Sequence, residues 1–504
     1  MRSETPEISE YYILSFWCLF MSYGGKDNMY DFLIIGAGIS GAMIARDLSK
    51  FKCSVALVEK DNDVANEATS ANSAIIHSGH DPKEGTLKAK LNVRGNELYE
   101  DLCKELKVDF ERNGAFVVAV AEDELPQLNF LYNQAISRNI PASIISAEEA
   151  HAKEPNLSDS VVAALELPST GIVSPWEVAI AAVEDACNNG VELFLGNKVV
   201  SIEKKKDHFV VTTTKGTYLA KFVINAAGVY ADDIYNLVSD KKLFTITPRR
   251  GEYYVLDKQT TPFVDRTIFP IPSAKGKGVL VAKTIHHNVI LGPNSEEIED
   301  KEGKDNTQPA LDYIRKEVFK TLKNIPLHQV IRTYTGLRPT GSTHDFIIEE
   351  ADDVANFINI AAIESPGLAS APAISEYVLN EIISKKFELV RKDSRVERRP
   401  WIIINRMNYD EKHALVQKDP AFAQMICRCE HISEGEIVDI IHRNAGAMTV
   451  KAVKRRVRPG AGRCQGGFCE PKVVAILARE LNKSPLDILL DSDDSKLLVG
   501  KTKE

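Results

Sequence analysis

The sequence predicts an α/β protein in which a parallel-sheet domain is split by an antiparallel α+β domain and followed by a small, mainly helical domain. Three observations carry this prediction. A strand, a glycine-rich turn, a helix and a second strand follow one another between residues 30 and 59. Short alternating strands occupy much of the stretch after this unit, and one apolar strand there ends at Ala227-Gly228. Four of the eight cysteines fall within residues 427–469.

The composition is that of a globular protein with more than one domain. The chain has 504 residues, 44% hydrophobic and 26% charged, and its Gly and Pro contents exclude collagen-like and wholly disordered chains. A net charge of −9 argues against a nucleic-acid partner, because neutralising phosphates needs a surplus of Lys and Arg. Residues 426–504 carry 14 basic and 11 acidic side chains, so this end is +3 and the remainder is −12. The C-terminal end is therefore predicted to be a separate unit.

The first 28 residues are predicted to be an extension outside the fold. Residues 11–23 are apolar, but these 13 residues are too few for a spanning helix, which needs about 20. The ten residues before them are acidic, whereas a signal peptide begins with basic residues. We therefore expect a cytoplasmic protein without a transmembrane span, and peripheral association with a membrane stays open.

The glycine turn has the pattern GxGxxG, formed by Gly36, Gly38 and Gly41, and it joins the strand at 30–35 to the next helix. Gly36 permits the tight turn, Gly38 lets the backbone approach a pyrophosphate, and Gly41 permits close packing of the helix on the strand. Glu59, at the end of the following strand, is placed to accept hydrogen bonds from ribose hydroxyls. This context predicts a Rossmann-like dinucleotide-binding domain.

The chain beyond this unit alternates strands, turns and helices. A helix is predicted over residues 91–106, and short strands recur between 250 and 295. Strands clustered between two dinucleotide-type segments predict an inserted antiparallel domain over roughly residues 90–150 and 240–335. Residues 396–425, charged at first and bounded by proline, are predicted to be a linker.

Five motifs between Met29 and Lys386 resemble the D-amino-acid oxidase-like superfamily of FAD-dependent oxidoreductases. They are the glycine turn with Glu59, NEATSANSAIIHSGH, FVINAAGVYADD, TGLRPTG and SPGLASAPA. The resemblance implies FAD as the cofactor, and an FAD-dependent oxidoreductase domain over residues 29–395 that is split by the substrate domain. It also implies further FAD-binding residues, namely Thr69, Ser70, Ser73, Gly228, Gly367 and Leu368. Within the superfamily, residues 73–96 are similar to L-2-hydroxyglutarate dehydrogenases and to bacterial FAD-dependent glycerol-3-phosphate dehydrogenases.

Oxidation of a secondary alcohol beside an anionic group needs a base and cations as well as a flavin. His77 is the candidate base, because an imidazole titrates near neutral pH and the resemblance places this segment along the flavin. Arginines suit the anion, because their planar fork binds phosphate or carboxylate with two hydrogen bonds. Arg338 occupies the position at which the superfamily carries its substrate-binding arginine. Arg249 and Arg250 are the next candidates, and one of the two is expected to be structural.

The four cysteines near the C-terminal end are predicted to be metal ligands. They are Cys427, Cys429, Cys464 and Cys469. Their spacing is CxC, then 34 residues, then CxxxxC, and four thiolates suit either zinc or a [2Fe-2S] cluster. Zinc ribbons generally use CxxC knuckles, so the CxC start argues against zinc. The surrounding sequence resembles the bacterioferritin-associated-ferredoxin-like module, which implies a [2Fe-2S]-binding domain over residues 426–490 and a tail over 491–504.

A run of basic side chains precedes the second cysteine pair. It comprises Lys451, Lys454, Arg455, Arg456, Arg458 and Arg463. Two interpretations stay open at this point: a solvated helix face, or a docking patch for an acidic electron-transfer partner.

Together these features predict an FAD-dependent dehydrogenase that oxidises sn-glycerol 3-phosphate to dihydroxyacetone phosphate. A hydride would pass to flavin N5, and electrons would leave through the [2Fe-2S] cluster to an acceptor protein or a quinone-linked subunit. Two alternatives stay open, an L-2-hydroxyglutarate (2-hydroxy acid) dehydrogenase and a non-catalytic electron-transfer or redox-sensing flavoprotein. The intact candidate arginines argue against the last of these.

Overall fold

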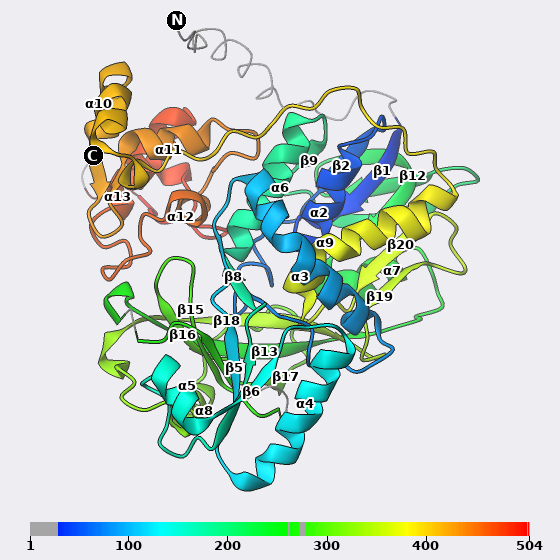
Figure 1. Ribbon diagram of the computed structural model, residues 1–504. Coiled ribbons are helices and arrows are strands. Elements are labelled where there is room, and N and C mark those ends of the chain that lie inside the picture. Colours follow the sequence, from blue (N-terminus) through cyan, green and yellow to red (C-terminus); the bar gives the residue numbers. More distant parts are fainter. Residues whose placement is uncertain (1–28, 261–262, 273–277, 501, 503–504) are drawn as a thin grey trace, which may run out of the picture.

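The chain forms three domains, which the computed structural model describes for residues 29–260, 263–272, 278–500 and 502. The extension predicted over residues 1–28 lies outside these described residues. Figure 1 shows the parallel-sheet domain at the upper right, the antiparallel-sheet domain below it and the C-terminal domain at the upper left. No helix in the described part is long and apolar enough to span a bilayer.

The parallel-sheet domain is built on the predicted strand, glycine turn, helix and strand. β1 covers Tyr30–Ile35, α2 covers Ile39–Leu48 and β2 covers Val55–Val58, which confirms that prediction. Every residue of β2 is buried, because parallel strands in such domains are covered on both faces. The parallel strands run in the order β9, β2, β1, β12 and β20. The three not yet introduced are β9 (Glu192–Phe194), β12 (Thr217–Asn225) and β20 (Phe357–Ala361).

Four helices pack on one face of this sheet. They are α2 with α3 (Leu87–Leu106), α6 (Pro175–Asn188) and α9 (Gly367–Tyr377). Three further strands extend the sheet in antiparallel pairs, β11 (Phe209–Thr213) on β12, β10 (Val199–Lys204) on β11 and β19 (Ile347–Glu350) on β20. A second core includes residues of these strands and of α7 (Ala231–Asn236).

Helix α3 confirms the predicted helix but lies in a different domain from the one expected. The sequence predicts that the insertion begins at about residue 90, whereas α3 packs on α9 in the parallel-sheet domain. A Cβ atom on Gly95 would lie 2.0 Å from the carbonyl oxygen of Ala369, so the two helices need glycine at this contact. The insertion therefore starts after α3.

The antiparallel-sheet domain contains a nine-stranded sheet of mixed direction in which only β14 and β5 pair in parallel. Its strands are β5 (Ala115–Ala119), β6 (Ser143–Ser146), β7 (Ala163–Leu167), β13 (Ile246–Leu256), β14 (Thr267–Pro270), β15 (Leu280–Lys283), β16 (Val289–Gly292), β17 (Glu296–Glu297) and β18 (Val330–Gly341). The helices in these segments are α4 (Leu125–Ser137), α5 (Ala147–Lys153) and α8 (Gln308–Glu317). The strands thus lie within residues 115–167 and 246–341, so they run past the predicted ends at about residues 150 and 335.

Strands β13 and β18 pair antiparallel along nearly their whole length and form the floor of the region between the two larger domains. Their register places Arg249 directly opposite Arg338, and Tyr253 directly opposite Tyr334. The two tyrosine rings stack with centroids 4.5 Å apart and planes inclined by 6°. Two candidate arginines thus come together from positions far apart in the chain.

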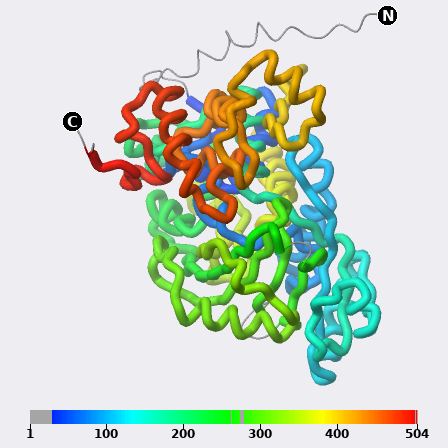
Figure 2. The backbone as a smooth tube through the Cα atoms, turned by 90° about the vertical axis from the view of Figure 1, so that its left-hand side faces the viewer, coloured from blue at the N-terminus to red at the C-terminus, as the bar shows by residue number. Residues whose placement is uncertain are grey.

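The C-terminal domain is mainly helical and has its own apolar core. It contains β21 (Met425–Cys427), β22 (Ile432–Ser433), α11 (Glu434–Ile441), α12 (Val450–Val457) and α13 (Glu470–Glu480). In Figure 2 this domain, in orange and red, lies above the green strands of the antiparallel-sheet domain.

The segment predicted as a linker is docked on the parallel-sheet domain. It contains α10 (Tyr409–Lys418) and Arg398, whose side chain is 1% exposed. The Arg398 guanidinium donates to Glu184 Oε2 at 2.9 Å and to the Leu106 carbonyl at 2.7 Å. These buried contacts hold the segment against the helical face.

Candidate active site and cysteine site

A cavity of about 870 Å³ lies between the parallel-sheet and antiparallel-sheet domains. It extends along the N-termini of α2 and α9 and along the loop that ends at His77. Ten predicted site residues line it, namely Gly38, Thr69, Ser73, His77, Gly228, Arg249, Arg250, Arg338, Gly367 and Leu368. The structure therefore brings most of the predicted flavin and substrate residues into one space.

Gly36 and Gly41 shape the turn behind the cavity wall. Gly36 has φ +103°, and a Cβ atom there would lie 2.5 Å from the carbonyl oxygen of Ala226. A Cβ atom on Gly41 would lie 2.0 Å from the Gly36 carbonyl oxygen, so the helix approaches the strand as closely as expected. The N-terminus of α2 consequently faces the cavity, where its backbone N–H groups can bind a pyrophosphate.

Glu59 lies at the end of β2 beside this turn and is 8% exposed. Its carboxylate accepts hydrogen bonds from the backbone N–H groups of Ala37 at 2.7 Å and Asp61 at 3.0 Å. Burial, reinforced by the nearby Asp61 carboxylate, raises the pKa of Glu59 to about 7. Glu59 is not among the residues that line the cavity, and both of its carboxylate oxygens accept backbone N–H groups, so its contact with a ribose stays a prediction.

Ser70 does not line the cavity, unlike its predicted neighbours Thr69 and Ser73. Its hydroxyl donates to the backbone carbonyls of Glu67 at 2.9 Å and Asn66 at 3.2 Å. Thr69 instead accepts a hydrogen bond from the Ile39 N–H at 2.9 Å, at the start of α2. The local turn thus ties the Ser70 hydroxyl to its own backbone, while the residues on either side of Ser70 line the cavity.

His77 lies in the cavity wall next to Phe269, with ring centroids 5.6 Å apart. Its backbone carbonyl accepts hydrogen bonds from Asn92 Nδ2 at 2.8 Å and Asn96 Nδ2 at 3.1 Å. Both asparagines belong to α3, so this helix fixes the backbone of the segment that carries the histidine. His77 is therefore positioned by a rigid element of the parallel-sheet domain.

Arg338 projects from β18 and is held by backbone carbonyls. Its Nη2 donates to Asn294 at 2.9 Å and to Arg250 at 3.3 Å, and its Nε donates to Arg249 at 3.4 Å. Burial lowers the pKa of this guanidinium from its ordinary value. No carboxylate of the described residues forms an ion pair with Arg338. It is a cation whose charge is left for a ligand to balance.

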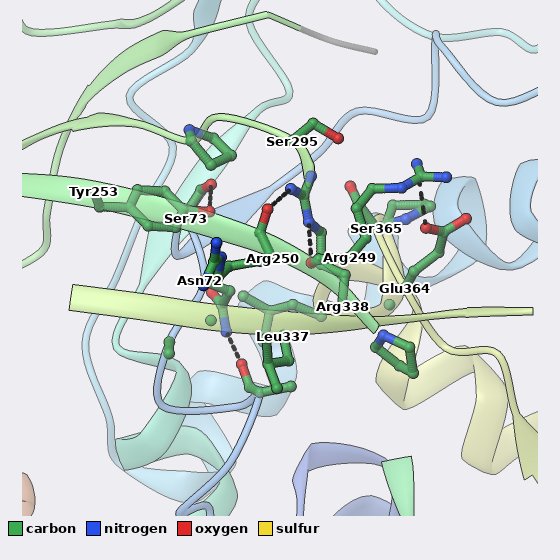
Figure 3. A pocket seen from close by; sticks show the side chains of 18 of the residues that line it. Asn72, Ser73, Arg249, Arg250, Tyr253, Ser295, Leu337, Arg338, Glu364 and Ser365 are labelled. Atoms are coloured by element: carbon green, nitrogen blue, oxygen red, sulfur yellow. Dashed lines mark hydrogen bonds and ion pairs between the residues drawn. The ribbon is translucent and has the colours of Figure 1, made fainter. Parts of the chain in front are cut away.

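Arg249 and Arg250 lie beside Arg338, between Tyr253 and Glu364, as Figure 3 shows. Arg249 pairs with Glu297 at 3.3 Å and Glu364 at 3.9 Å, and Arg250 pairs with Glu296 at 2.7 Å. Both arginines are thus partly neutralised by the protein, which distinguishes them from Arg338. Arg250 Nε is nevertheless buried with no hydrogen-bond partner among the described residues.

Sequence reasoning missed four residues that shape this cavity: Tyr253, Asn294, Gly336 and Glu364. Tyr253 OH lies 3.0 Å from Ser73 Oγ, and Glu364 accepts from Thr340 at 2.8 Å and pairs with Lys88 at 2.6 Å. A Cβ atom on Gly336 would lie 1.9 Å from the Ala71 carbonyl oxygen. A glycine inside a strand pattern is a signal of such close approach, so Gly336 could have been found.

The four C-terminal cysteines converge as two pairs. Cys429 Sγ and Cys464 Sγ lie 3.7 Å apart, and the Cys427 and Cys469 thiols hydrogen-bond to each other. Two thiolates on one tetrahedral metal, with metal–sulfur bonds of about 2.3 Å, stand about 3.8 Å apart. Among the described residues, no group of three or more metal-ligating side chains gathers around one point. Two pairs suit the two irons of a [2Fe-2S] cluster.

Backbone N–H groups point at these sulfurs. The Cys427 sulfur accepts hydrogen bonds from the Cys469 thiol and from the backbone N–H groups of Gly460, Glu430 and Cys429. The Cys469 thiol lowers the pKa of Cys427 most, and the N–H groups add to this effect, whereas burial raises that pKa. The N–H groups of Gly466 and Phe468 donate to Cys464. Donors of this kind stabilise thiolates and tune a bound cluster.

The basic run binds the C-terminal domain to the rest of the protein. Arg455 and Arg456 donate to Asp63, Arg458 to Asn288 and Arg463 to Asp257. Within the C-terminal part, Lys451 pairs with Asp491, and Lys454 lies 3.5 Å from Gln465 Oε1. The run as a whole is therefore neither a solvated face nor an external docking patch, because its arginines are paired within the chain, although the Arg463 side chain stays 60% exposed.

Comparison with known proteins gives the family. The model of the family "FAD dependent oxidoreductase" matches residues 31–380, more than half of the chain. The chain belongs to this family of FAD-dependent oxidoreductases. A second model, "BFD-like [2Fe-2S] binding domain", matches residues 425–479 of the oxidoreductase. Its cofactors are thus FAD and a [2Fe-2S] cluster, as the sequence predicts.

Several relatives of this oxidoreductase share most of its length. A "Glycerol 3-phosphate dehydrogenase" from Caloramator mitchellensis is 50% identical over 94% of this chain and 99% of its own. A "Glycerol 3-phosphate oxidase" from Mycoplasma genitalium is 32% identical over 71% of this chain and 95% of its own. The solved structure of an L-alpha-glycerophosphate oxidase from Mycoplasma pneumoniae with FAD bound superposes with a TM-score of 0.70, at 30% identity, over 74% of this chain and 100% of that chain.

The cavity fits the FAD that the family requires. Gly36, Gly38 and Gly41 leave the α2 N-terminus open for the pyrophosphate, and Glu59 lies beside this turn, where its carboxylate accepts from the Ala37 N–H. The same cavity extends past Ser73 to the N-terminus of α9 at Gly367, which leaves room for the rest of the dinucleotide.

Proposed function

We propose that this oxidoreductase oxidises sn-glycerol 3-phosphate to dihydroxyacetone phosphate and passes the electrons to an acceptor outside the protein. The observation that carries the proposal is Arg338, a cation in the wall of the FAD cavity that is held by carbonyls and forms no ion pair with a carboxylate in the part of the chain that the structure describes. A phosphate bound there would be anchored by a planar fork of donors. The "Glycerol 3-phosphate dehydrogenase" of Caloramator mitchellensis aligns with 94% of this chain, the C-terminal part included. Its name supports a phosphorylated substrate and a dehydrogenase activity for this chain.

The residues of the cavity have separate roles in this proposal. Arg338 binds the phosphate, with Arg250 Nε as a second donor, and Arg249 and Glu364 close that side of the cavity. His77 accepts the hydroxyl proton as the C2–H bond breaks and the C2–O bond becomes a carbonyl. Bound FAD supplies the hydride acceptor at N5, and the [2Fe-2S] cluster supplies a one-electron path to the acceptor.

A second substrate class is favoured by one observation. An "L-2-hydroxyglutarate dehydrogenase" from Indibacter alkaliphilus is 32% identical over 55% of this chain and 71% of its own. Its substrate, named in its description, is a 2-hydroxy acid, and an arginine fork binds carboxylate as well as phosphate. The fuller match to the glycerol 3-phosphate relatives makes this the second candidate.

Anaerobic reduction of the bound flavin distinguishes the candidates. The holoenzyme is mixed with sn-glycerol 3-phosphate or with L-2-hydroxyglutarate, and the flavin absorbance and the electron paramagnetic resonance (EPR) signal of the reduced cluster are followed. Bleaching by glycerol 3-phosphate alone, followed by the cluster signal, is the expected result. Bleaching by L-2-hydroxyglutarate alone assigns the second candidate, and bleaching by neither contradicts both.

A further inference from the structure

Four exposed side chains lie in the cluster-binding loops and at the start of α13. We call these the exit rim, and it comprises Arg428, Arg463, Phe468 and Lys472. Arg428 lies between the ligands Cys427 and Cys429, and Phe468 directly precedes Cys469. Arg463 also belongs to the basic run and pairs with Asp257, whereas the other residues of the exit rim lie outside that run.

Phe468 is the apolar centre of the exit rim. Its side chain is 84% exposed, although a phenylalanine ordinarily buries its ring. Its own backbone N–H donates to the sulfur of Cys464. Phe468 therefore binds a cluster ligand through its main chain and exposes its aromatic ring to solvent.

Most of the charges around this ring are positive. Arg428 and Lys472 are exposed, and the Arg463 side chain stays 60% exposed although it pairs with Asp257. The acid of the first loop, Glu430, is turned inward: its side chain is 9% exposed and pairs with Lys258 and Arg458. Glu470, directly after Cys469, is partly exposed, so three cations stand against one outward acid in residues 427–430 and 463–472.

We propose that the exit rim is the docking surface for a small acidic protein that carries one electron. Interfaces of this kind combine a central aromatic anchor with a charged edge, and opposite charges raise the rate of encounter. The inference rests on the proposed exit of electrons through the C-terminal domain. Each encounter passes one electron to the oxidised carrier, so the two electrons of one turnover leave in two successive encounters.

The test uses two probes of opposite charge and does not depend on the substrate. Holoenzyme is reduced with dithionite, freed of the excess, and mixed anaerobically with rubredoxin, a small acidic one-electron carrier, or with basic cytochrome c. We expect the second-order rate constant for rubredoxin to fall at least tenfold when the ionic strength rises from 20 mM to 300 mM, whereas that for cytochrome c does not fall. Isothermal titration with oxidised rubredoxin measures docking without electron transfer.

Three variants locate the surface. Arg428→Glu and Lys472→Glu should each lower the rubredoxin rate constant and affinity about tenfold at low salt, with little difference at 500 mM salt. Phe468→Ala should lower the affinity at both salt concentrations, because it removes the apolar anchor. Lys483→Glu is the matched control, because this exposed lysine lies just beyond the far end of α13 and should leave both values unchanged.

The outcomes separate this proposal from the proposed function. An EPR titration of each variant measures cluster content and reduction potential. Where both are unchanged, a lowered affinity for rubredoxin reports a loss of docking. Equal binding of rubredoxin and cytochrome c, or equal effects of Lys472→Glu and Lys483→Glu, overturns the docking surface. A holoenzyme that binds rubredoxin at the exit rim but is not reduced by glycerol 3-phosphate keeps the docking surface and contradicts the proposed substrate.

Discussion

The carboxylate of Asp63 binds the guanidinium of Arg456 through two hydrogen bonds of 2.7 and 3.0 Å, and both side chains are 2% exposed. Asp63 lies in the loop after β2, which ends at Val58, and Arg456 belongs to α12 of the C-terminal domain. Arg455 donates to the same carboxylate at 2.8 Å. One acid of the parallel-sheet domain therefore binds the domain that carries the cluster ligands.

Asp63→Ala should destabilise the protein and loosen the C-terminal domain. It leaves the buried Arg456 guanidinium without a carboxylate and leaves Arg455 with Asp491 alone, at 3.2 Å. Removing one partner of a buried ion pair costs about 3 to 5 kcal/mol. Denaturant unfolding measures this loss, and faster proteolysis within residues 396–425 reports the loosening. Asp393→Ala is the control, because the Asp393 carboxylate is 91% exposed in its pair with Lys52. Equal stability of both variants would contradict the role of Asp63.

The Asp63 pair also has a defined pH dependence. Burial opposes ionisation, but Arg456 and Arg455 hold the pKa of Asp63 below its ordinary value of 3.8. The stabilisation is therefore fully present above pH 3.8 and is lost as the pH falls through the lower folded-state value. Over pH 5 to 8, the stability difference between wild type and Asp63→Ala should stay constant.

FAD affinity should depend on pH through Glu59. In the protein without FAD, the pKa of Glu59 is raised to about 7, so the neutral acid prevails below pH 7. The contribution of Glu59 to the free energy of unfolding therefore falls as the pH rises from 4.5 through 7. A carboxylate that accepts ribose hydrogen bonds must be ionised, so FAD should bind about tenfold more tightly at pH 8 than at pH 6. Fluorescence titration of the apoprotein measures this ratio. Glu59→Gln should bind FAD more weakly at pH 8 and show no such ratio.

Arg338→Lys should raise the KM for glycerol 3-phosphate about ten- to hundredfold while the flavin stays bound. Lysine keeps the charge but loses the fork, and a hydrogen bond to a charged group contributes about 1.5 to 3 kcal/mol. Steady-state kinetics with a one-electron acceptor measures the effect. Arg315→Lys, an exposed position on α8, is the matched control. An unchanged KM in Arg338→Lys would place the phosphate elsewhere.

His77→Gln should lower kcat by about 10²- to 10⁴-fold and leave flavin content and KM nearly unchanged. Glutamine keeps a hydrogen-bonding group in the cavity wall but cannot take up the hydroxyl proton, and general base catalysis contributes a factor of this size. Rapid-reaction flavin reduction isolates the step. His208→Gln, beside Asp207 and away from the cavity lining, is the control. Full turnover in His77→Gln would mean that another group is the base.

Cys464→Ser should remove the cluster and keep the flavin reaction. Serine is a much weaker ligand for iron than thiolate, so iron content and the EPR signal should fall to background. Substrate should still bleach the flavin, whereas transfer to a protein acceptor should fall by more than tenfold, because an aqueous carrier must then reach the flavin itself. Cys53→Ser, at a cysteine outside the cluster loops, tests for general damage.

Local patterns predicted much of the molecule. The turn at Gly36 and the strands on either side follow from backbone sterics and hydrophobic period, and the structure has them where expected. The arginines and cysteines could be proposed because their chemistry suits anions and iron. Helix α3 was predicted as a helix but placed in the wrong domain, since an amphipathic pattern shows that a face is buried without showing what covers it.

The sequence by itself determined the local conformations and the chemical types available at each site. The tertiary structure decided which of these groups meet. Asp63 and Arg456 are 393 residues apart, and the partner carbonyls of Arg338 come from residues 44 to 89 positions away. Such pairs depend on the path of the whole chain, which no local pattern records. For that reason the basic run could be recognised as charged from its sequence, while its role in fixing the C-terminal domain required the folded molecule.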